Sequence, residues 1–324
     1  MSTENHRWAI VLAAGEGTRL RSLTTDAVGT SIPKQFCSFQ RPHSMLRDAV
    51  LRARRHVLPE HILVIVSTLH RLWWKPQLAD FPEENIVEQP ESRGTAAGVL
   101  LPLIEILRRD PEAEIFLLPS DHFVKKENVL EHAAAAAFPA AHEAFQRVVL
   151  LGMMPEHPDP DFGWIVPRLR GREMIPGVEA FVEKPEPSIA KRLFQTGGLW
   201  NSFILAASGK TLLFLFQEKL PDLLAPVLPR IFQSGGRWNP RELAAVYERL
   251  PSYDFSKNLL ERAVSRLGVM PVPPCGWSDL GTPERVRRCL IRSGENWDVD
   301  YYSKFLGRPI LLPHVEDSRT GPDL

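Results

Sequence analysis

The sequence predicts an α/β fold in which helices cover a mostly parallel central sheet. The first observation is an alternation, through the first half of the chain, of short β-branched runs with longer amphipathic segments. The second is composition: 44% of the 324 residues are hydrophobic and 24% are charged, which is ordinary globular usage and excludes a disordered or collagen-like chain. This length allows about two domains, or one large α/β domain with additions.

Short apolar runs predict the strands of the first half. Each run is bounded by polar or turn residues, as expected for strands covered on both faces. They are Trp8–Leu12, Ile62–Ser67, Ile115–Leu118 and Val148–Gly152. Helices are predicted between them, because Ser44 is a suitable N-cap for a helix through His56 and the other segments are amphipathic. These other helices are Thr95–Arg109 and Lys126–Gln146, the latter with a break near Pro139.

The second half of the chain has a different sequence pattern. Proline, glycine and charged residues separate short segments there, as expected of strands that leave and re-enter a sheet. Residues 209–264 are mostly helical by pattern. Strands are predicted at Phe162–Pro167, Val178–Val182 and Leu267–Val272, and a helix at Pro283–Arg292.

Charge and hydropathy exclude several classes of partner. Lys+Arg and Asp+Glu both count 39, so no net field would draw the protein to nucleic acid or to an anionic membrane. No apolar run approaches the roughly 20 residues that span a bilayer, and the N-terminus lacks the pattern of a signal peptide. The three scattered cysteines suit reduced thiols rather than a disulfide framework. We therefore expect a cytoplasmic protein.

The clearest chemical motif follows the first predicted strand. The run Leu12-Ala-Ala-Gly-Glu-Gly-Thr-Arg-Leu20 ends a strand in small residues, so its backbone N–H groups can face a phosphate. Two glycines alone would favour an ordinary turn, but Arg19 and Lys34 would add mobile positive charge and so favour the phosphate site. A Rossmann dinucleotide site is disfavoured because Leu20 stands where a third glycine is needed, and the P-loop spacing is absent from the sequence.

These residues resemble the sugar-phosphate nucleotidyltransferases, and among them the mannose-1-phosphate guanylyltransferases, over about residues 8–290. The opening motif ends in Pro33-Lys34-Gln35-Phe36, and further blocks follow in the family's order. They are Glu88-Gln89-Pro90, Arg93-Gly94-Thr95-Ala96, Pro119-Ser120-Asp121-His122, Phe162-Gly163-Trp164, Phe181-Val182-Glu183-Lys184-Pro185, Leu199-Trp200-Asn201-Ser202 and Trp277-Ser278-Asp279-Leu280-Gly281. Departures are a loop between Leu23 and Pro33 about four residues longer than usual, and Ser22, Ala97 and Phe203 at positions where the family commonly has proline, proline and glycine.

The resemblance implies a Rossmann-like fold of the nucleotide-diphospho-sugar transferase type. The transferase domain would cover residues 1–294, with a nucleotide-binding half over about 1–152 and a sugar-phosphate-binding half over about 153–294. A C-terminal tail, 295–324, would follow. The sequence leaves open whether that tail lies across the surface or pairs with a second copy in a homodimer.

Two carboxylates are candidates for a Mg²⁺ site. Asp121 follows a predicted strand, at the sheet edge where open α/β folds bind ligands. Asp279 follows Leu267–Val272 after an irregular stretch and could converge with Asp121 on one ion that also binds substrate phosphate. The alternative is that Asp121 caps a loop and Asp279 caps the helix near Pro283.

Other roles are implied by the resemblance. Lys184, at a strand end, would bind the sugar phosphate, with a surface Glu183–Lys184 pair as the alternative. Sugar contacts are implied for Gly163, Glu183 and Asn201, while His122 is interpreted as structural. Nucleotide contacts are implied for Ala13, Ala14, Gly15, Glu16, Gly17, Thr18, Gln89, Gly94, Thr95 and Ser120.

The implied reaction joins a nucleoside triphosphate to a sugar 1-phosphate and releases pyrophosphate. Arg19, Lys34, Asp121, Lys184 and Asp279 would carry it, and GTP with mannose 1-phosphate would be the substrates. Two alternatives stay open: the same reaction with another base or hexose, and a non-catalytic binder of nucleotide sugars.

Overall fold

A computed structural model of the chain describes residues 6–25, 29–38, 43–143, 147–168, 175–233 and 238–293. Within these residues one sheet contains nine strands. They are β1 (Arg7–Ala13), β2 (Ile62–Ser67), β3 (Ile86–Gln89), β4 (Glu114–Pro119), β5 (Val148–Met153), β6 (Trp164–Pro167), β7 (Val178–Val182), β8 (Leu199–Ser208) and β9 (Leu267–Val272). The α-helices are α1 (Arg21–Thr24), α2 (Met45–Arg54), α3 (Arg71–Gln77), α4 (Gly94–Arg109), α5 (Glu127–Glu143), α6 (Pro187–Gln195), α7 (Gly209–Lys219), α8 (Pro221–Leu224), α9 (Pro240–Tyr247) and α10 (Pro283–Ser293).

The sheet is mixed and mostly parallel, as the sequence predicts. Its strand order is β3-β2-β1-β4-β8-β5-β9, and β6 pairs with β7 and β8 off this path. Strands β1 to β4 pair in parallel, whereas β8 runs antiparallel between β4 and β5. Because β8 comes from the predicted sugar-binding half and β4 from the nucleotide-binding half, the two halves share one continuous sheet.

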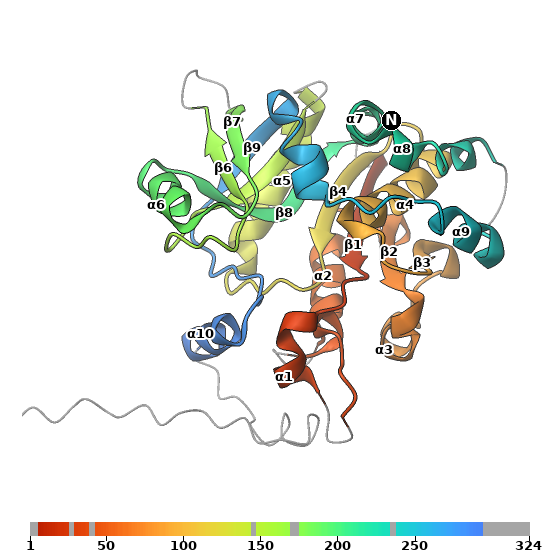
Figure 1. Ribbon diagram of the computed structural model, residues 1–324, viewed down its shortest axis with the longest axis horizontal. Helices are drawn as coiled ribbons and strands as arrows, with labels where there is room; N and C mark the ends of the chain where they lie inside the picture. Colours follow the sequence, from red (N-terminus) through yellow and green to blue (C-terminus); the bar gives the residue numbers. More distant parts are fainter. Residues whose placement is uncertain are drawn as a thin grey trace, which may run out of the picture.

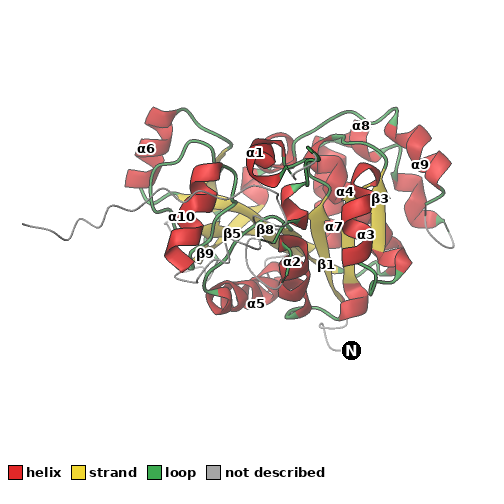
Figure 2. Cartoon of the chain, turned by 90° about the horizontal axis from the view of Figure 1, so that it is seen from below, coloured by secondary structure: helices red, strands yellow, loops and turns green. Residues whose placement is uncertain are grey.

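Helices cover both faces of this sheet. Alternate residues of β1 point to opposite cores, as the two-residue period of a strand requires. Ala9 and Val11 pack in the core with residues of α2, α3 and α5, whereas Trp8 and Ile10 pack with residues of α4 and α7. In Figures 1 and 2, α6 and α10 lie toward one end of the molecule and α3, α4 and α9 toward the other.

Most predicted elements are present, and the exceptions have physical reasons. Ser44 is the N-cap of α2, its hydroxyl accepting the Arg47 N–H at 3.2 Å. The predicted break near Pro139 is wrong, because α5 continues through this residue to Glu143. Ala134, Ala137 and Phe138 are fully buried in the same helix, so tertiary packing outweighs the lost hydrogen bond. The predicted tail, 295–324, lies outside the described residues.

Two strands were not predicted from the sequence. β3 has only four residues, and β8 contains polar residues near its start, which obscure the apolar run. In the part of the chain that is described, no helix is both long and apolar enough to cross a membrane.

Candidate active site

The loop after β1 is fixed by hydrogen bonds from a buried glutamine. Gln35 Nε2 donates to the carbonyl oxygens of Ala13 at 3.0 Å and of Gly15 at 2.7 Å. Gly15, Glu16, Thr18 and Arg19 are exposed on this loop. Gly17 has a φ of 62°, and a Cβ atom there would lie 2.9 Å from the Lys34 backbone nitrogen. The loop therefore packs closely on Lys34 and leaves its outer side accessible. Sequence reasoning gave Gln35 no role, although it stands inside the opening motif.

Lys34 is fixed rather than mobile, which corrects the sequence-based expectation. Its side chain is only 8% exposed, and Nζ lies 2.9 Å from Asp121 Oδ2 and donates to the Asp279 carbonyl oxygen at 2.6 Å. An ammonium buried in this way needs such partners, because an unpaired buried charge is costly. Lys34 therefore joins both predicted metal ligands, whereas Arg19 stays exposed as expected.

Asp121 lies just beyond β4, at the carboxyl edge of the sheet. Its segment runs beside that of Asp279, because Phe123 and Ser278 exchange backbone hydrogen bonds of 2.9 Å in both directions. Burial opposes ionisation of Asp121, but the Lys34 ammonium and the neighbouring His122 hold the pKa of this carboxyl below its usual value. Asp121 is therefore a carboxylate at neutral pH. Ser120, before it, donates its hydroxyl to the Leu12 carbonyl at 2.7 Å.

Asp279 combines features of both sequence-based interpretations. Its Oδ1 accepts the Gly281 N–H at 2.9 Å, close to the start of α10, and Arg285 Nη1 lies 3.0 and 3.1 Å from its two oxygens. A carboxylate has about four acceptor sites, so neither Asp279 nor Asp121 is saturated by these contacts. Metal binding by the two residues stays a prediction.

The carboxylates of Asp121 and Asp279 supply only some of the ligands that Mg²⁺ needs. Among the described residues there is no group of three or more His, Cys, Asp or Glu side chains placed to hold a metal. Mg²⁺ usually keeps several waters and binds through one or two carboxylates together with substrate phosphates. Asp121 and Asp279, which both contact Lys34 beside an accessible loop of small residues, match that requirement.

His122 is structural, in agreement with the sequence-based interpretation. Its Nδ1 accepts the Trp277 indole N–H at 3.2 Å, and the rings meet edge to face with centroids 5.2 Å apart. Burial lowers the pKa of this imidazole to about 4, despite the neighbouring carboxylates, so it is neutral at physiological pH. Its Trp277 contact helps to join the Asp121 and Asp279 segments.

The predicted base and ribose contacts lie at the end of β3 and the start of α4. Gln89 is 3% exposed, and its Oε1 has no hydrogen-bond partner among the described residues. Gly94 has a φ of 77°, and a Cβ atom there would lie 2.2 Å from the Tyr253 carbonyl oxygen. Thr95 Oγ1 accepts the Phe255 N–H at 2.7 Å. The start of α4 is thus fastened to the segment 253–255.

The predicted sugar contacts form one cluster. A Cβ atom at Gly163 would lie 2.5 Å from Glu183 Oε2 and 3.2 Å from Asn201 Cβ, so these residues are in close contact. Glu183 Oε2 is buried and has no hydrogen-bond partner within the described chain. Burial, reinforced by Asp254 and Glu261 and opposed by Lys184, raises the pKa of the Glu183 carboxyl to about 7. An unpaired buried acceptor is costly unless a ligand supplies its donor.

Non-glycine residues with left-handed backbone flank this cluster. Lys184 has a φ of 47° and Phe203 a φ of 60°, conformations that cost energy for side chains with a Cβ. Asn201 Oδ1 stabilises the second by accepting the Phe203 N–H at 3.1 Å. Lys184 is 53% exposed while Glu183 is only 15% exposed, and Nζ lies 3.9 Å from Glu183 Oε1. This separation makes a long ion pair with one mostly buried partner, so the alternative of a Glu183–Lys184 pair stays open.

The segment 253–260 contacts both halves of the predicted site. Phe255 is bonded to Thr95, as described, and Ser256 Oγ accepts from Asn201 Nδ2 at 3.2 Å. Ser256–Leu260 forms a π-helix, a feature frequent at functional sites. The sequence did not single out this segment, because residues 209–264 show only a general helical pattern.

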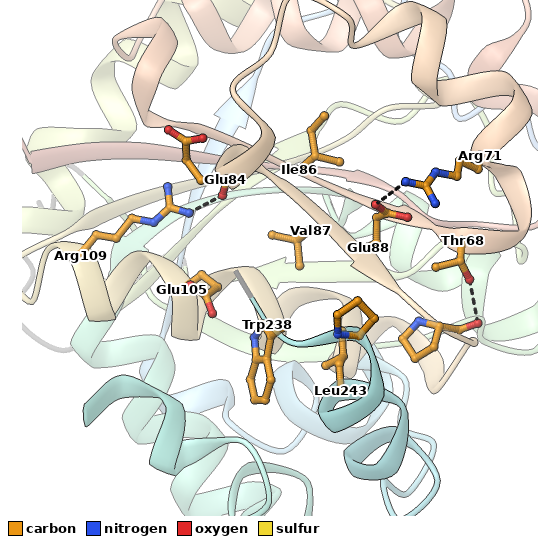
Figure 3. A pocket seen from close by; sticks show the side chains of 12 residues that line it. Thr68, Arg71, Glu84, Ile86, Val87, Glu88, Glu105, Arg109, Trp238 and Leu243 are labelled. Carbon is orange, nitrogen blue, oxygen red and sulfur yellow. Dashed lines mark hydrogen bonds and ion pairs between the residues drawn. The ribbon is translucent and has the colours of Figure 1, made fainter. Parts of the chain in front are cut away.

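A separate cavity of about 370 Å³ wraps the outer edge of β3. Ile86 and Val87 line it from the strand, with Arg109, Trp238 and Leu243 around them (Figure 3). Glu88, one of the side chains expected near the base, also lines it, whereas the other residues predicted to bind substrate do not. This cavity therefore lies beside the predicted base contacts and apart from the junction of Lys34, Asp121 and Asp279.

A mixed sheet with a glycine loop and two carboxylates near the carboxyl ends of its strands is typical of the α/β folds that bind ligands at that edge. The sequence matches the profile of the nucleotidyl transferase family over residues 8–289. The chain therefore belongs to the nucleotidyl transferase family.

Known proteins similar to this chain carry related descriptions. Mannose-1-phosphate guanylyltransferase 2 of Escherichia coli O157:H7 is 30% identical over 313 residues, which cover 91% of this chain and 60% of that protein. A putative mannose-1-phosphate guanylyltransferase of Vibrio cholerae serotype O1 is 26% identical, covering 84% and 58%. A crystal structure described as a mannose-1-phosphate geranyltransferase from Thermus thermophilus has a TM-score of 0.74 at 26% identity, covering 90% and 80%. The chain spans about three fifths of the length of the curated relatives it matches.

Proposed function

We propose that the protein transfers a nucleotidyl group from a nucleoside triphosphate to a sugar 1-phosphate, and that these substrates are GTP and mannose 1-phosphate. The observation that carries the proposal is the junction of Lys34, Asp121 and Asp279. It lies where the loop after β1 meets the strand-end segments around Asp121 and Asp279. The names of similar proteins support the choice of substrates.

The chemistry requires charge neutralisation rather than a general base. A phosphate monoester has a second pKa of about 6, so the sugar phosphate is largely dianionic at neutral pH and is already nucleophilic. Its oxygen attacks the α-phosphorus, a bond to that phosphorus forms, and pyrophosphate leaves with the electron pair of the broken bond. When bound, Mg²⁺ would supply Lewis-acid neutralisation of the α-phosphate.

The residues of the chain then have separate tasks. Asp121 and Asp279 would hold the ion, and Lys34 keeps these two residues together. Arg19, exposed on the loop, would neutralise the departing pyrophosphate, and Lys184 would align the sugar phosphate. Glu183 and Asn201 would bind sugar hydroxyls. A non-catalytic binder would have no need to keep all five charged groups.

Base choice depends on the acceptors near the predicted base contacts. Guanine offers N1–H and N2–H₂ donors, so its pocket must supply acceptors. The candidates are backbone carbonyls near Ala13–Ala14 and side chains around Glu88–Gln89. The Ala13 carbonyl accepts from Gln35 and keeps a second lone pair, and Gln89 Oε1 is buried without a partner in the described chain. We expect GTP to exceed ATP and UTP by a factor of about ten or more in kcat/KM with mannose 1-phosphate.

A substrate panel tests the proposal. The purified chain is assayed for pyrophosphate release with GTP, ATP, UTP or dTTP and with mannose or glucose 1-phosphate. Highest kcat/KM with GTP and mannose 1-phosphate is expected. Preference for another pair would assign the same reaction to other substrates, and binding without pyrophosphate release would favour the non-catalytic alternative.

A further inference from the structure

Arg285 makes contacts that set it apart from its neighbours on α10. Arg287 and Arg288 pair with Glu284 on the same helix and are 43% and 41% exposed. Arg285 is 7% exposed and instead contacts carboxylates outside its helix, Asp279, six residues earlier, and Asp159, 126 residues earlier. Its contacts therefore join separate segments and do not merely support the helix.

The guanidinium joins three carboxylates. Nη1 lies 3.0 and 3.1 Å from the two oxygens of Asp279, while Nη2 donates to Asp159 at 2.7 Å and to Asp161 at 3.3 Å. Asp159 and Asp161 belong to the loop between β5 and β6, which leads to Gly163. Only the planar, forked guanidinium can satisfy acceptors on two sides in this way. One positive charge against three carboxylates also leaves the group net negative and able to attract a cation.

Packing fixes the arginine in this position. Its guanidinium lies over the Phe162 ring, 4.2 Å from the centroid, and Phe162 packs against Trp200 and Trp277. Gly281 is necessary for the close approach, since a Cβ atom there would lie 2.4 Å from Asp279 Oδ2 and 2.9 Å from Arg285 Nη1. The side chain thus has little freedom to leave Asp279.

We propose that Arg285 is a positioning residue that orients Asp279 for Mg²⁺–nucleotide binding and couples it to the loop that precedes the sugar contacts. This inference rests on the proposed function. Arg285 contacts no substrate itself. Its removal would free Asp279 to rotate and would loosen the link to residues 159–163, while the base subsite at Gln89 would be untouched.

The experiment compares Arg285→Met with Arg287→Met, a matched control on the exposed side of the same helix. Arg285→Met is expected to lower kcat by about ten- to hundred-fold. Calorimetry with GTP, without sugar phosphate, supplies a readout other than turnover. Affinity for GTP should fall about tenfold when Mg²⁺ is present and change less than about twofold when it is absent. If the role of Arg285 were purely structural, its loss would change the affinity for GTP equally with and without Mg²⁺, or would change neither.

The outcomes separate this inference from the proposed function. Asp279→Asn is measured in the same series, and wild-type turnover of that variant would refute the assignment of the site itself. If Asp279→Asn is inactive while Arg285→Met matches Arg287→Met in kcat and in Mg²⁺-dependent affinity, the positioning role is refuted. Should Arg285→Met not fold, Arg285→Lys gives the same readouts, because an ammonium keeps the charge but cannot bind Asp279 and Asp159 in the same forked geometry.

Discussion

The nucleotide side and the sugar side of the candidate site are built in different ways. On the nucleotide side Gly17 and Gly94 have left-handed backbone, as does one non-glycine residue, Leu280 beside Asp279, and the Lys34 ammonium is paired. On the sugar side two non-glycine residues, Lys184 and Phe203, adopt left-handed backbone, and Glu183 is buried without a partner for Oε2 among the described residues. Within the described ranges, unpaired buried acceptors lie on both sides, Gln89 Oε1 at the predicted base contacts and Glu183 Oε2 at the predicted sugar contacts. The comparison suggests that the part of the nucleotide side around Lys34 is preformed, whereas the base and sugar contacts are completed by the substrates.

The largest effect is expected where the two sides meet. Asp121→Asn should lower kcat by about 100-fold or more, because the charge that would hold the ion is lost. The amide oxygen can still accept from Lys34, but the buried ammonium loses its charge partner, so the unfolding temperature should fall while the fold is retained. Asp80→Asn is the control, since Asp80 pairs with Arg47 on the surface. Near wild-type turnover of Asp121→Asn at saturating Mg²⁺ would contradict the shared-ion hypothesis.

Substitutions of Lys34 on the nucleotide side and Lys184 on the sugar side should differ in their effects on protein stability and on substrate affinity. Lys34→Met breaks a buried ion pair and should destabilise the fold by about 2–4 kcal/mol in urea unfolding. Lys184→Met alters a half-exposed residue and should change stability by less than about 0.5 kcal/mol. It should instead raise KM for the sugar phosphate by about tenfold and lower kcat, while calorimetric affinity for GTP is retained. A large loss of GTP affinity in Lys184→Met would place this lysine on the nucleotide side.

A pair of glycines tests how tightly the nucleotide side is preformed. Gly94 and Gly197 have φ values of 77° and 82°, so the backbone cost of alanine is similar at both. A Cβ atom meets nothing within 4 Å at Gly197 but would lie 2.2 Å from the Tyr253 carbonyl oxygen at Gly94. Gly94→Ala should therefore lose about 1–3 kcal/mol more than Gly197→Ala and should weaken GTP binding. Equal losses of stability in the two variants would show that the backbone of segment 253–255 can move to accommodate the added Cβ atom.

The smallest expected effect is a pH dependence on the sugar side. Since burial raises the pKa of Glu183 to about 7, the folded state binds its proton more tightly than the unfolded state. This group's contribution to stability is therefore fully present below its ordinary pKa and is lost as pH rises toward 7. Glu183→Gln should remove this dependence, making the variant more stable relative to the wild type at pH 8 than at pH 5, by about 1–3 kcal/mol. A constant difference across that range, measured by urea unfolding, would rule out the raised pKa.

The sequence predicted local elements better than the contacts that join them, for physical reasons. Strands such as Ile62–Ser67 are continuous apolar runs, and the loop after β1 has the small residues that a phosphate needs. Local patterns of this kind can be recognised in the sequence alone. The approach of the Asp121 and Asp279 segments was expected, but the fixation of Lys34 between them depends on a hydrogen bond across 245 positions and was not.

Other features depend on tertiary structure alone. The unbroken α5 follows from packing around Pro139, and β8 became a central strand by insertion between β4 and β5. Arg285 looked like one of several arginines on an amphipathic helix, and only the fold brings it to Asp159 and Asp279. The Thr95–Phe255 hydrogen bond likewise has no local signal.

The central claim, direct transfer between substrates bound on the two sides, can be tested by isotope labelling. Mannose 1-phosphate carrying ¹⁸O in its non-bridging phosphate oxygens is incubated with GTP, Mg²⁺ and the enzyme, and the products are analysed by ³¹P NMR and mass spectrometry. Direct attack on the α-phosphorus predicts GDP-mannose that retains all of the label, with one labelled oxygen bridging the two phosphorus atoms, and unlabelled pyrophosphate. Label in pyrophosphate, release of GMP as leaving group, or no GDP-mannose at all would contradict the account.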